Sequence, residues 1–68
     1  MTAHVSVTAV ITDRWGETTE EWCGTQPEWA WAHADEWRKM MRRQVLGART
    51  ADPRGWRVTW RAVPEDES

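Results

Sequence analysis

The chain has 68 residues, a net charge of −2 and a single cysteine, Cys23. A chain of this length has room for one small hydrophobic core, and one thiol excludes both an intrachain disulfide and a cysteine-rich metal cluster. No apolar run approaches the roughly 18 residues of a transmembrane helix, and no signal-peptide pattern opens the chain. We therefore expect a single domain over residues 1–68, located in the cytoplasm and making no contact with a membrane.

The first predicted element is a strand over about residues 4–12, because apolar and polar residues alternate from Val5 to Ile11. The sequence Asp13–Gly16 that follows suits a type I turn closed by a glycine in the left-handed conformation. We expect a hairpin whose returning strand, about residues 17–23, is polar and lies at a sheet edge. Closing this hairpin between Asp13 and Glu17 pairs Ile11 with Thr19 and sends Trp22 to the opposite face of the sheet.

A long helix is predicted over about residues 26–46. Thr25 and Glu28 match a capping box at its start, and Gly47 suits the left-handed position just after a helix. A helical wheel places Trp29 and Trp37 on one continuous apolar arc.

On the same wheel, His33 falls between these two tryptophans and is expected to be a core histidine. Trp31 falls on the charged flank, between Arg38 and Arg42. Two interpretations of Trp31 stay open. It anchors an interface, or it folds back over the helix flank onto the stem of Arg38.

The last predicted strand covers about residues 56–63, where Trp56, Val58 and Trp60 alternate with Arg57 and Arg61, and an acidic tail follows over 64–68. These elements predict an α+β fold of order ββαβ, a three-stranded sheet with one long helix packed on one face. Placing the last strand beside the first and parallel to it would give a minimal β-grasp-like layout.

Charge is strongly segregated along the chain. Residues 13–36 contain seven acids and one base, whereas residues 37–61 contain eight bases and one acid. Two explanations are open. Acids early and bases late in a helix suit its dipole, and a charge-polarised molecule can also bind an oppositely charged partner or a second copy head to tail.

Catalytic chemistry finds little support in this sequence. The chain has two histidines, His4 and His33, with neither a CxxC nor an HxxxH pair, and no glycine-rich phosphate loop. Cys23 is expected to be a small buried residue near the helix start, a position that can lower the pKa of a thiol. We therefore expect no enzyme activity, no catalytic residues, no metal and no cofactor.

A binding or regulatory role is the remaining expectation, with a protein partner that is most simply a second copy in a homodimer. Two surfaces are candidates, one made by Trp31, Arg38 and Arg42, the other by Trp22, Arg57 and Arg61. The alternative function is nucleic-acid binding through the basic half of the helix and the arginine-lined strand face. The acidic pI of about 5.6 counts against that alternative.

Overall fold

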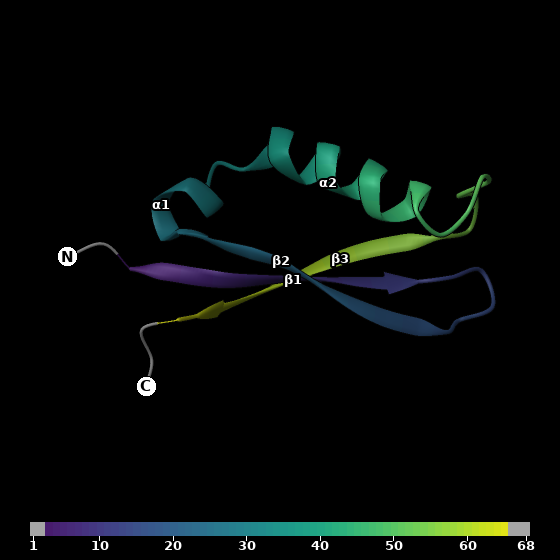
Figure 1. Ribbon diagram of the computed structural model, residues 1–68, viewed down its shortest axis with the longest axis horizontal. Coiled ribbons are helices and arrows are strands. Elements are labelled where there is room, and N and C mark those ends of the chain that lie inside the picture. The colour runs from purple at the N-terminus through teal and green to yellow at the C-terminus, as the bar shows by residue number, and fades with distance from the viewer. Residues whose placement is uncertain (1–2, 66–68) are drawn as a thin grey trace.

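The computed structural model describes residues 3–65, in the order β1 (His4–Thr12), β2 (Thr18–Pro27), α1 (Glu28–Trp31), α2 (Asp35–Gly47) and β3 (Arg57–Pro64). The strands form one sheet, and the helices lie on one side of it (Figure 1). The predicted α+β fold is therefore confirmed, with the helical segment divided in two. Of the expected acidic tail, Pro64 ends β3 and residues 66–68 lie outside the described residues.

All three strands are antiparallel to their neighbours, in the order β2-β1-β3. The last strand does lie beside the first, but the parallel direction of the β-grasp-like layout is wrong, because the two strands are antiparallel. β2 ends beside the start of β1, and the helical segment then runs back along the sheet to the hairpin end, where Arg57 pairs with Thr12. A helical crossover joins parallel strands. The pair that it makes parallel here is β2 and β3, and β1 lies antiparallel between them.

The hairpin follows the predicted register near its turn. Ile11 pairs with Thr19, and the turn is closed by hydrogen bonds from the Gly16 and Trp15 amides to Asp13. Gly16 has φ +87°, the left-handed conformation expected for it. Beyond Thr8 the register shifts at a β-bulge in β2, because Cys23 and Gly24 together oppose a single residue of β1. β2 consequently continues to Pro27, four residues beyond its predicted end.

This extension of β2 removes the expected helix start. Pro27 precedes α1, no side chain caps either helix, and the predicted capping box of Thr25 and Glu28 is wrong because Thr25 lies within the strand. The helix end also differs from the prediction. Gly47 is the last residue of α2 and has no positive φ, since the chain continues into Ala48 in a right-handed conformation.

A three-residue break at 32–34 separates α1 from α2. The amides of His33 and Ala34 donate to carbonyls three residues back, and the Arg38 guanidinium donates to the Trp31 carbonyl at 2.7 Å. In a continuous helix that carbonyl accepts the amide of Asp35. The break rotates the residues of α1 relative to those of α2, so one helical wheel does not describe both.

The prediction of a core role for Trp29 and His33 is therefore wrong. The side chain of Trp29 is 68% exposed, and His33 is also exposed. The prediction for Trp37 holds, because its ring centroid lies 5.5 Å from that of Trp60 on β3. The core lies between α2 and the inner face of the sheet, and its fully or nearly buried members are Val5, Val7, Ala9, Ile11, Ala34, Val45 and Leu46.

The turn before β3 gives a direct test of backbone strain. Gly55 has φ +83°, and a Cβ there would lie 3.0 Å from the Cβ of Arg14. We expect Gly55→Ala to lower the free energy of unfolding by roughly 1–2 kcal/mol in urea denaturation. Gly47→Ala is the matched control, since that glycine is helical with open space around it, and it should stabilise by about 0.5–1 kcal/mol. Equal stability of the two variants would contradict the turn geometry.

Candidate functional site

The sheet has an inner face covered by α2 and an outer face that neither helix covers (Figure 1). The strand registers and the alternation of side chains determine which residues share the outer face. We call this surface the open face. Its residues are Ser6, Thr8, Val10 and Thr12 from β1, Thr18, Glu20 and Trp22 from β2, and Arg57, Thr59, Arg61 and Val63 from β3.

Trp22 is the largest side chain of the open face and is 64% exposed. Trp22 pairs with Thr8 of the neighbouring strand β1, and its indole Nε1 donates a 2.9 Å hydrogen bond to the hydroxyl of Ser6, also on β1. Because the acceptor belongs to the neighbouring strand, the ring is held across the sheet. The ring thus presents an oriented apolar surface to solvent, and the hydrogen bond leaves it little rotamer freedom.

The two arginines of the open face differ in their partners. Arg61 forms a bidentate ion pair with Glu20 that crosses over β1. Arg57, in contrast, makes no ion pair within residues 3–65. The structure therefore brings Trp22, Arg57 and Arg61 onto one face, as the alternation predicts, and within residues 3–65 Arg57 is the one of the two arginines that has no ion pair.

The other predicted surface is divided by the fold. Trp31 is half-buried, with its ring centroid 5.9 Å from Trp37 and 6.3 Å from Trp60. The Arg38 guanidinium lies over the Trp31 ring at 4.0 Å, so both side chains serve an internal aromatic cluster. Of the two open interpretations of Trp31, the structure matches the one in which the ring folds back toward Arg38. Arg42 does not join them.

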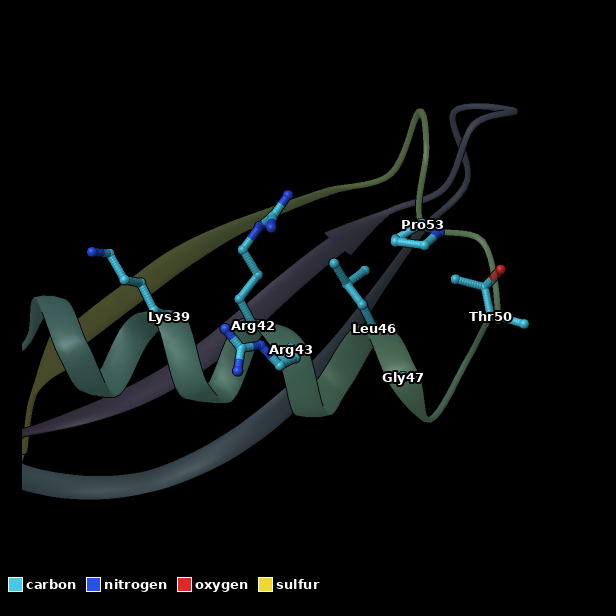
Figure 2. Close-up of a pocket in the computed structure, with 8 residues that line it drawn as sticks. Lys39, Arg42, Arg43, Leu46, Gly47, Thr50 and Pro53 are labelled. Carbon is cyan, nitrogen blue, oxygen red and sulfur yellow. The ribbon is translucent and has the colours of Figure 1, made fainter.

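Arg42 lies instead on a groove between α2 and the loop that follows it (Figure 2). The groove has a volume of about 370 Å³. Lys39 and Arg42 extend from the same side of α2, while Leu46 and Pro53 lie at the loop end. The full lining, which we call the basic groove, is Lys39, Arg42, Arg43, Leu46, Gly47, Thr50, Ala51 and Pro53.

The cations of the basic groove have little compensation from the chain itself. Within residues 3–65, Arg42 and Arg43 make no ion pair, and Lys39 approaches Glu36 only to 4.0 Å. The loop contains one acid, Asp52, and both of its carboxylate oxygens accept 2.9 Å hydrogen bonds from the Arg54 guanidinium. These hydrogen bonds hold the pKa of the Asp52 carboxyl below its usual value. The groove therefore keeps its positive charge.

Helix capping does not account for these cations either. The last turn of α2 contains no basic residue, and the carbonyl of Val45 accepts a 2.9 Å hydrogen bond from Arg49, which lies beyond the helix. Because the dipole acts mainly within the last turn, Arg42 and Arg43 gain little from it.

No protein-family model, no curated protein and no solved structure matches the chain.

The groove was not predicted from the sequence, although the spacing of its α2 residues could have indicated one of its two walls. Lys39, Arg42, Arg43 and Leu46 have the i, i+3, i+4, i+7 spacing of one helix flank. The opposite wall comes from the irregular loop of residues 48–56, whose path no periodicity describes.

Cys23 and the histidines form no site within residues 3–65. Cys23 is half-buried against the core, and burial raises the pKa of its thiol, opposite to the lowered pKa considered from the sequence. No group of three or more His, Cys, Asp or Glu side chains in this part of the chain is arranged to hold a metal ion. Neither described helix has the length and apolar composition needed to cross a bilayer.

Proposed function

We propose that this chain is a non-enzymatic protein-binding module that self-associates through its open face. The observation that carries the proposal is Trp22, a largely exposed ring held across an uncovered sheet face by its hydrogen bond to Ser6. Trp and Arg are the residues that most often dominate binding energy at protein interfaces. Val10 and the 48%-exposed Val63 extend the apolar part of this face.

A second copy is the simplest partner for such a face. In a two-fold symmetric dimer the same patch contacts itself, so any charges that it carries must complement one another. The open face has an acid, Glu20, and two bases, Arg57 and Arg61. Such a dimer would also cover apolar surface that this small domain leaves in water.

Sedimentation velocity over a range of concentrations tests the proposal. We expect Trp22→Ala to weaken self-association at least about tenfold while leaving the thermal unfolding transition nearly unchanged. Trp29→Ala is the matched control, because Trp29 is similarly exposed at 68% but lies on α1, away from the open face. A parent chain that stays monomeric at all concentrations would refute the proposal, as would equal effects of the two variants.

Nucleic-acid binding is the second candidate, and the uncompensated cations of the basic groove favour it. The two basic regions considered from the sequence lie on opposite sides of the sheet, since α2 covers the inner face and Arg57 and Arg61 are on the open face. A single strand cannot follow both without wrapping around an edge. Self-association through the open face therefore remains the function we propose.

A further inference from the structure

We propose that the basic groove is a second binding site, which receives the acidic segment Pro64–Glu67 of another copy of this chain. The inference is independent of the open face, because the groove lies on the helical side of the sheet. It follows from the charge of the groove, its apolar wall and the sequence of the acidic segment.

The charges of the two elements are complementary. The groove presents Lys39, Arg42 and Arg43, of which the arginines have no ion pair within residues 3–65. The segment supplies three consecutive acids, Glu65 to Glu67. Arginine forks bind carboxylates by paired charge-assisted hydrogen bonds, so three acids in sequence give each cation a partner.

The apolar lining favours a peptide over a nucleic-acid backbone. Leu46, Ala51 and Pro53 form part of the groove wall, and the acidic segment begins with a proline. A peptide that carries one apolar residue beside its acids uses both parts of the lining. A phosphate backbone uses only the cations and leaves the apolar part of the lining without a partner.

The acidic segment begins at the end of β3, at the end of the sheet remote from the loop wall of the groove. β3 starts near the loop that lines the groove and ends at the opposite end of the sheet, as Figure 1 shows. Its eight residues span roughly 23 Å. Three further residues, even fully extended, reach at most about 11 Å. The segment of one molecule therefore cannot reach the loop wall of its own groove, and a second copy supplies it.

The experiment uses a synthetic peptide of residues 62–68 and the full chain carrying Trp22→Ala, which removes the open-face contact. In NMR titrations at low salt, we expect the peptide to shift the amide signals of Arg42, Arg43 and Thr50. Raising the salt concentration should weaken binding. The double variant Arg42→Glu/Arg43→Glu should weaken it at least about tenfold. Arg57→Glu is the matched control on the open face and should leave peptide binding unchanged.

A charge swap completes the test in the full chain. A variant with lysines at residues 65–67 should fail to bind the parent groove and should bind the Arg42→Glu/Arg43→Glu variant instead. Absence of peptide binding would overturn the inference, and so would shifts confined to the open face. Binding of a short oligonucleotide at these amides, with no peptide binding, would overturn it in favour of nucleic acid. Because the titration uses the Trp22→Ala chain, failure here leaves open-face self-association untouched.

Discussion

Replacing Trp60 with alanine is expected to lower the free energy of unfolding by about 3–5 kcal/mol, the largest effect that we expect of a single substitution in this chain. Trp60 lies on the inner face of β3, packs against the buried core, and contacts Trp31 and Trp37 with ring centroids 6.3 and 5.5 Å away. Truncation removes this contact area and two aromatic contacts, the edge-on one with Trp31 and the tilted one with Trp37. Each such contact contributes about 0.5–1.5 kcal/mol beyond the burial of its area.

Chemical denaturation with a matched control measures this effect. Trp29→Ala deletes the same side chain at a position that is 68% exposed, and it should change stability by less than about 0.5 kcal/mol. Because a small domain has only a few kcal/mol of total stability, Trp60→Ala is expected to be largely unfolded at 37 °C. Similar stability of the two variants would contradict the placement of the aromatic cluster.

The sheet was largely predictable from the sequence because strand periodicity is local. Alternation from Val5 to Ile11 and the Asp13–Gly16 turn together determine which side chains share a face. This is why Trp22, Arg57 and Arg61 were expected on one surface and lie on one surface. The bulge at Cys23 and Gly24 was missed because the returning strand was expected to end at Cys23, before the register shifts.

The helix was less predictable because its phase depends on a tertiary contact. A helical wheel assumes a constant angle of rotation from each residue to the next. The break at 32–34 interrupts the helix, so the wheel does not give the positions of α1 residues relative to those of α2. The break is stabilised by Arg38, whose side chain bonds the Trp31 carbonyl from seven residues away. Sequence reasoning therefore placed Trp29 inside, where the structure has it exposed, and left open whether Trp31 is an interface residue or folds back toward Arg38, as the structure shows.

The two arginines that were expected to flank Trp31 differ in role, and a paired substitution separates them. We expect Arg38→Ala to lower the free energy of unfolding by about 2–3 kcal/mol. The loss combines a cation–π contact at 4.0 Å, worth up to about 2 kcal/mol, with a charged hydrogen bond of 2.7 Å to a part-buried carbonyl. The ion pair with Asp35 adds little, because that carboxylate is 87% exposed.

Arg42→Ala should leave stability within about 0.5 kcal/mol of the parent, because Arg42 makes no ion pair within residues 3–65 and lies on the groove. Urea denaturation of both variants is the measurement, and Arg38→Lys sharpens it. Lysine keeps the positive charge but has no planar guanidinium. It therefore cannot both stack on the Trp31 ring and donate a hydrogen bond to the Trp31 carbonyl. If Arg38→Lys were as stable as the parent, charge alone would explain the role of Arg38. A loss close to that of Arg38→Ala would show that its planar geometry holds the break between α1 and α2, and with it the inward position of Trp31.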